Sequence, residues 1–141
     1  MPDEENLPGL VARWIAKAES DYGTAEWLLK NADPFREQIA FHCQQAAEMY
    51  LKGFLTRHGA SHPKTHDIRL LVNLSARVEP EIATTLRDLD YLTPYGVETR
   101  YPSDFPDMLP GDEVRVFALA TQARDLLLPK LQAFVKGAES A

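Results

Sequence analysis

Apolar residues recur at intervals of three and four along most of this chain, and no stretch shows the alternation that a half-buried β-strand requires. Such spacing collects apolar side chains on one side of an α-helix. The sequence therefore predicts an all-α protein: an up-and-down four-helix bundle with an additional short helix and a long loop before the last helix. The expected helices cover about residues 8–31, 34–58, 67–77, 79–92 and 112–136, and the loop covers 93–111.

Turn-forming residues indicate where these helices begin and end. Asp33 and Pro34 suit the start of the second helix, and Gly59 is placed to end it. Thr65 is a candidate cap for the third helix. Pro129 stands inside the last helix, where its missing N–H predicts a kink or an early end.

Length and composition indicate the number of domains and the location of the protein. The 141 residues suffice for one core, so we expect a single helical domain over residues 1–141, with its core at about 8–136. The one cysteine, Cys43, excludes a disulfide within the chain and a cysteine-based metal site. The acidic first residues, and the lack of an apolar stretch of bilayer length, predict a cytoplasmic protein that does not associate with membranes.

Charge is distributed unevenly along the chain. The net charge is −6, which opposes nonspecific binding of nucleic acid over the whole surface. Residues 52–77, however, contain five basic residues and one acid, so this segment carries +4 and the remainder carries −10. A basic patch on an acidic body suits a phosphate-bearing ligand or an acidic partner protein. The alternative is that these side chains point in different directions and never converge.

The second predicted helix carries a polar stripe beside its apolar face. Gln45, Glu48 and Lys52 fall on one side, and His42 lies at the margin of that stripe. These four side chains are candidates for holding a polar ligand. The alternative is a solvated helix face, in which Glu48 and Lys52 form an i,i+4 pair worth about 0.2–0.5 kcal/mol.

Two Arg–His pairs have a spacing that suits metal-independent RNA cleavage, because arginine stabilises phosphate charge while histidine transfers protons. Arg36 and His42 share one helix and point about 240° apart, so they would converge only across a dimer interface or if the helix begins later. Arg57 and His62 run from a helix end into a loop, which leaves their geometry open. For both pairs the alternative is chance spacing among solvated residues.

Two further groups of residues need an interpretation. His58, His62 and His66 are spaced by four, but Gly59 and Pro63 interrupt the helix between them, so we expect no metal and no cofactor. Arg100 and Tyr101 precede a proline in the long loop, where they could clamp a phosphate and stack on a base. The alternative for this pair is a loop tied to the bundle by an Arg–Asp bridge, with Asp90 as the candidate partner.

Three motifs together resemble the HEPN domain family. They are His42-x-x-Gln45-Ala46-Ala47-Glu48-x3-Lys52, then Lys64-Thr65-His66-Asp67-Ile68-x-Leu70-Leu71, then Arg100-Tyr101-Pro102. The resemblance implies a helical bundle that commonly dimerises. It also implies a minimal nucleotidyltransferase as partner in many bacterial members, often as a toxin–antitoxin pair. Toxic members are metal-independent ribonucleases that use an Arg-x4-6-His motif from both protomers, and other members are regarded as nucleotide-binding partners.

The chain departs from the ribonuclease pattern of that family. The Arg-x4-6-His motif of toxic members usually lies late in the bundle, whereas no histidine follows His66 here. Met49 also stands where a lysine is common. We therefore expect a nucleotide- or phosphate-binding module, with a metal-independent ribonuclease toxin and a non-catalytic dimeric interaction protein as alternatives. Arg36 and His42 are the candidate catalytic residues, and the expected ligand-binding residues are His42, Gln45, Glu48, Lys52, Lys64, His66, Arg100 and Tyr101.

Large apolar residues near the first two helices predict a homodimer. Trp14, Tyr22, Trp27 and Phe35 supply more apolar surface than one narrow core needs, so part of it is expected to be shared between subunits.

Overall fold

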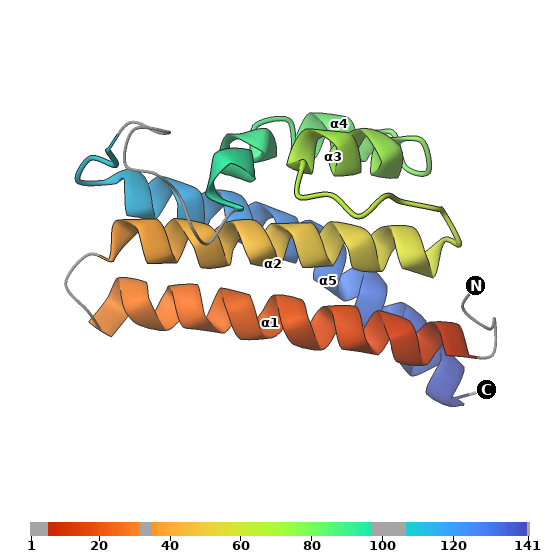
Figure 1. The fold of residues 1–141 in the computed structure, drawn as a ribbon. Coiled ribbons are helices and arrows are strands. Elements are labelled where there is room, and N and C mark those ends of the chain that lie inside the picture. Colours follow the sequence, from red (N-terminus) through yellow and green to blue (C-terminus); the bar gives the residue numbers. More distant parts are fainter. Residues whose placement is uncertain (1–5, 32–34, 97–106, 141) are drawn as a thin grey trace.

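The computed structural model describes residues 6–31, 35–96 and 107–140. Two long helices, α1 and α2, lie side by side and antiparallel, and a third, α5, crosses behind them (Figure 1). The short helices α3, α4 and η2 lie on the side of α2 that faces away from α1, where α3 and η2 pack against α2 and α4 packs against α3. The predicted all-α class is confirmed. The elements are α1 (Leu7–Asn31), α2 (Arg36–Arg57), α3 (Ile68–Ala76), α4 (Glu81–Thr85), the 3-10 helix η2 (Leu89–Tyr95) and α5 (Asp112–Ser140).

Helix α2 is the central element, because α1, α5, α3 and η2 all pack against it. Its residues are buried almost without interruption from Cys43 to Thr56, with only Gln45 and Met49 partly exposed. Burial therefore extends beyond the apolar face to polar side chains on the same helix, and a buried polar group is costly unless it finds a partner inside the protein. The burial of Glu48 and Lys52 excludes a solvated helix face for these two residues of the polar stripe, whereas His42 and Gln45 are partly exposed.

The end of α2 is fixed by Gly59, as the sequence predicts. Gly59 has φ +65°, and its N–H donates to the Thr56 carbonyl at 3.0 Å. The N–H of Ala60 donates to the Leu55 carbonyl at 2.9 Å. These two bonds form a Schellman motif, which satisfies the last carbonyls of the helix and sets the direction in which the chain leaves it.

The start of α3 differs from the prediction that Thr65 caps it. The helix begins at Ile68, and the Asp67 side chain accepts a hydrogen bond from the Leu70 N–H at 3.3 Å. Thr65 instead accepts from the Asp67 N–H at 3.0 Å. The prediction was wrong because an aspartate stands two positions closer to the helix, where its carboxylate reaches the free N–H of the first turn.

The expected helix over residues 79–92 is divided into α4 and η2. Leu86, Leu89 and Leu92 are all buried and are spaced by three residues. A 3-10 helix repeats every three residues, so it keeps such side chains on one face, whereas an α-helix would rotate them apart.

The start of α2 also differs from the prediction, since Phe35 occupies its N-cap position without a side-chain hydrogen bond. Asp33 and Pro34 lie outside the described residues.

Helix α5 continues through Pro129 as far as Ser140, so of the two predicted effects of this proline the early end is wrong, and the kink stays a prediction. A proline inside a helix costs about 3 kcal/mol, mainly through a lost hydrogen bond and a clash with the preceding turn. Leu127 and Leu131, on either side of Pro129, are both fully buried. Their packing against the bundle depends on the helix continuing, and we attribute its persistence to that packing.

Candidate functional site

The Glu48 carboxylate lies at the centre of a polar cluster in α2. The residue is 1% exposed. One of its oxygens, Oε2, accepts a hydrogen bond from Lys52 Nζ at 3.0 Å, and the other, Oε1, lies 2.7 Å from Nδ1 of His66. Because an ionised carboxylate only accepts hydrogen bonds, the contact with His66 places a proton on Nδ1. A buried carboxylate in this setting needs both partners to offset its desolvation.

Gln44 connects this carboxylate to the loop before α3. Its Nε2 donates to Glu48 Oε1 and to the His66 carbonyl, both at 3.1 Å. Gln44 is fully buried, and a Cβ added to Gly96 would lie only 2.8 Å from its side-chain amide. Any larger residue at position 96 would therefore displace Gln44. We refer to Gln44, Glu48, Lys52 and His66 as the Glu48 cluster.

The cluster has a buried half and an exposed half. The Lys52 side chain is 10% exposed, whereas the His66 side chain is 61% exposed. The second ring nitrogen of His66, Nε2, forms no hydrogen bond within the part of the chain that the structure describes. Lys64, two residues before His66, is also exposed. Within the described residues, the Glu48 carboxylate thus orients the His66 ring through Nδ1, and Nε2 is left for a ligand.

The structure brings together only some of the residues expected in the site. Glu48, Lys52 and His66 converge, but His42 does not join them, because its Nδ1 lies 2.8 Å from Asp21 Oδ1 on α1. Gln45 is partly exposed, and its Oε1 has no hydrogen-bond partner among the described residues. Arg100 and Tyr101 lie outside the described residues.

Sequence reasoning missed Gln44 and Gly96. The signal for Gln44 was its position four residues before Glu48, which places the two side chains together on a helix. The signal for Gly96 was weaker, since a lone glycine after a proline-containing segment has many explanations. Asp90, the candidate partner for Arg100, is paired with Arg69 at 2.6 Å, and Arg100 itself lies outside the described residues.

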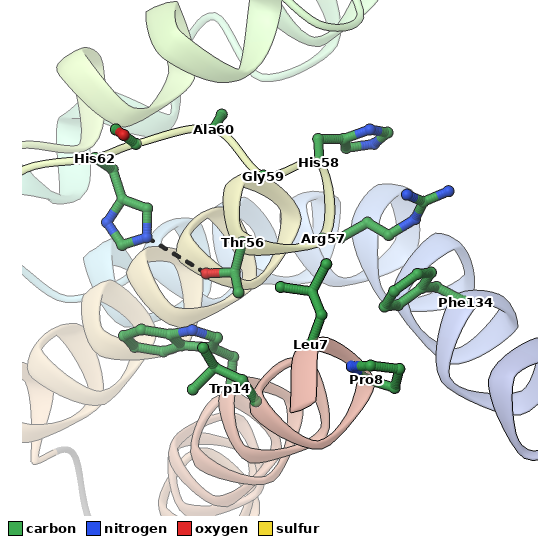
Figure 2. A pocket seen from close by; sticks show the side chains of 12 residues that line it. Leu7, Pro8, Trp14, Thr56, Arg57, His58, Gly59, Ala60, His62 and Phe134 are labelled. Atoms are coloured by element: carbon green, nitrogen blue, oxygen red, sulfur yellow. Dashed lines mark hydrogen bonds between the residues drawn. The ribbon is translucent and has the colours of Figure 1, made fainter. Parts of the chain in front are cut away.

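The two Arg–His pairs have different surroundings. Arg36 Nε donates to Glu113 on α5 at 2.9 Å, so Arg36 and His42 are held by different helices within one protomer. Arg57 and His62 line one cavity of about 880 Å3. Figure 2 shows their side chains pointing apart, with Arg57 directed toward Phe134 and His62 toward Trp14. Neither pair forms a joint Arg–His contact.

The imidazoles at the cavity are biased toward their neutral forms. Burial lowers the pKa of His62, and the positive charge of Lys52 lowers it further. Burial and the charge of Arg57 lower the pKa of His58 in the same way. Both side chains are therefore predominantly neutral at pH 7.

Other candidate chemistry finds no support in the described part of the chain. Burial raises the pKa of the Cys43 thiol to about 12, so this cysteine is a poor nucleophile. No group of three His, Cys, Asp or Glu residues within the described ranges is placed to hold a metal ion. Among the described helices, none combines the length and the apolar character needed to cross a bilayer.

Comparison with known proteins adds one finding. The family model of the HEPN domain matches residues 11–127, from the first turns of α1 into the second half of α5. No curated protein and no solved structure matches the chain. The matched range contains α2, the loop before α3 and the whole Glu48 cluster, so the family assignment and the residues that suggested it cover the same part of the molecule. The resemblance predicted from the motifs is confirmed, and the chain belongs to the HEPN family.

Proposed function

We propose that this chain is a non-catalytic HEPN module that binds the phosphate of a nucleotide or an RNA at the Glu48 cluster. The observation that carries the proposal is the shared carboxylate: Lys52 and His66 come from two elements and contact the two oxygens of Glu48. This arrangement orients an exposed imidazole beside an ammonium group. Lys64 adds a further positive charge nearby in the sequence. Because Glu48 neutralises one charge, the site suits moderate rather than tight anion binding.

A comparison of two histidines tests this proposal. His66→Ala removes the exposed half of the cluster and is expected to weaken the binding of ribonucleoside triphosphates at least tenfold, about 1.4 kcal/mol, by isothermal titration calorimetry. His42→Ala is the matched control, because His42 also pairs with a carboxylate but lies outside the cluster. Binding should also weaken as salt rises. Equal effects of the two substitutions, or no binding by the wild-type protein, would contradict the proposal.

Arg100, in the predicted long loop before the last helix, provides a second substitution for the same calorimetric experiment. The sequence predicts that Arg100 clamps the phosphate, so Arg100→Ala is expected to weaken triphosphate binding to a similar degree. Lys52→Ala is a poorer probe, because Lys52 is 8% exposed and its loss leaves Glu48 with fewer partners.

We infer a binding role rather than a ribonuclease role from the separate partners of the candidate catalytic residues. Arg36 is paired with Glu113, and His42 with Asp21. The purified protein is expected to cleave no RNA in the presence of a metal chelator, as judged by gel electrophoresis of a labelled transcript. Cleavage that His42→Ala abolishes, with the fold intact, would overturn this inference and support the toxin alternative.

The proposed module acts as a homodimer and as the partner of a small nucleotidyltransferase. Tyr22 is not available for a dimer surface, since it is buried against Phe117, whereas Trp14 is partly exposed and lines the cavity. Four other large apolar residues are exposed near one end of the bundle, where α1 ends and α2 and α5 begin (Figure 1). We name these residues the end patch: Trp27, Phe35, Leu109 and Val114. A nucleotidyltransferase in the neighbouring reading frame would support the partnership.

A further inference from the structure

The cavity lined by Arg57 and His62 lies at the end of the bundle opposite the end patch, and the proposed function does not use it. It lies where the beginning of α1, the end of α2 and the second half of α5 meet, and it has a volume of about 880 Å3 (Figure 2). This volume is in the range of small-molecule sites, about 300–1,000 Å3. The walls are largely apolar, with Leu7, Leu10 and Phe134 among them. A ligand that fills this space therefore has an apolar body.

Two residues that line the cavity, Trp14 and Arg57, carry hydrogen-bond donors with different surroundings. The Trp14 Nε1 atom is buried and has no hydrogen-bond partner among the described residues. The Arg57 guanidinium lies over the Phe134 ring, 4.3 Å from its centroid, and forms no ion pair within the described part of the chain. Arg57 is partly exposed, so its guanidinium is accessible to an anionic ligand, whereas the buried Trp14 Nε1 atom is not, and Trp14 offers a ligand the apolar surface of its ring.

The charge of the lining is positive. Among the described residues, no aspartate or glutamate lines the cavity, and Arg57 is the one cationic side chain of that lining at pH 7, because burial lowers the pKa of His58 and of His62. Glu79, whose charge acts on His58, is itself paired with Lys130 at 3.1 Å. One guanidinium that has no carboxylate partner among these residues matches a ligand with a single negative charge.

We propose that this cavity binds a small monocarboxylate with an apolar body. The carboxylate pairs with Arg57, and the apolar body packs against Leu7, Leu10 and the ring of Trp14. This site is separate from the Glu48 cluster, so it can fail or succeed independently of the proposed phosphate binding.

Two compounds that differ only in their head group test the proposal, 4-phenylbutyrate and 4-phenyl-1-butanol. Calorimetry is expected to show at least tenfold tighter binding of the carboxylate than of the alcohol, about 1.4 kcal/mol. Binding is also expected to change Trp14 fluorescence in a Trp27→Phe background, because Trp14 is then the only tryptophan. No binding of either compound, equal affinities, or an unchanged Trp14 signal would overturn the proposal.

Substitutions at Arg57 test whether this residue pairs with the carboxylate of the ligand. Arg57→Gln is expected to bring the two affinities within about threefold of each other, a difference of less than 1 kcal/mol, and Arg57→Lys to retain most of the preference. Arg77→Gln is the control, because Arg77 belongs to the same basic segment but is exposed and does not line the cavity. If Arg57→Gln lowers the melting temperature too far for titration, Arg57→Met, which keeps an apolar stem beside Phe134, replaces it with the same expected result. An unchanged preference in Arg57→Gln, or a lost preference in Arg77→Gln, would contradict the assignment.

Discussion

Replacing Glu48 by leucine is expected to lower the free energy of unfolding by about 3–5 kcal/mol, because it leaves a buried ammonium group without its counter-charge. Lys52 is 8% exposed, and its Nζ donates to Glu48 at 3.0 Å. The same substitution removes the acceptor for His66 and one of the two acceptors for the Gln44 amide. Urea unfolding followed by circular dichroism measures the loss.

The chain contains a matched control for this experiment. Glu26 and Lys30 have the same i,i+4 spacing on α1, but their side chains are 43% and 65% exposed. Glu26→Leu is therefore expected to change the free energy of unfolding by less than about 1 kcal/mol. The double variant Glu48→Leu with Lys52→Leu should recover at least half of the loss, since two apolar side chains remove both buried charges. A loss at Glu48 no larger than that at Glu26 would show that the buried pair contributes little.

Introducing charge into the end patch is expected to separate the proposed dimer. Trp27 is 61% exposed and Phe35 is 50% exposed, although both are large and apolar. Trp27→Asp combined with Phe35→Asp should raise the dimer dissociation constant at least a hundredfold, about 2.8 kcal/mol, because association would then bury two carboxylates. Sedimentation velocity over a range of protein concentrations measures this shift.

The control for the end patch is Val78, which is 38% exposed and lies just after α3. Val78→Asp is expected to leave the dissociation constant unchanged. A wild-type protein that sediments as a monomer at micromolar concentration would refute the dimer. If Val78→Asp raises the dissociation constant as much as the double variant does, the dimer interface does not lie specifically at the end patch.

Features that depend on residues close together in the chain were predictable from the sequence. The spacing of apolar residues predicted the all-α class, and Gly59 predicted the end of α2 because a left-handed turn there favours glycine. The pairing of Glu48 with Lys52 also follows from local geometry, since residues four apart share one side of a helix. The family motifs likewise lie in short segments, which is why the HEPN assignment could be made from them.

Features that depend on which elements pack together were decided only by the tertiary structure. His42 lies in α2 and pairs with Asp21 on α1, whereas His66 lies in the loop before α3 and pairs with Glu48 on α2, because different elements cover the two sides of that helix. The continuation of α5 through Pro129 and the burial of Gln44 have the same origin, since in each case packing outweighs a local preference. Spacing along the chain specifies the direction of a side chain from its helix axis, but its burial and its partner depend on the neighbouring element, and that neighbour is often distant in the sequence.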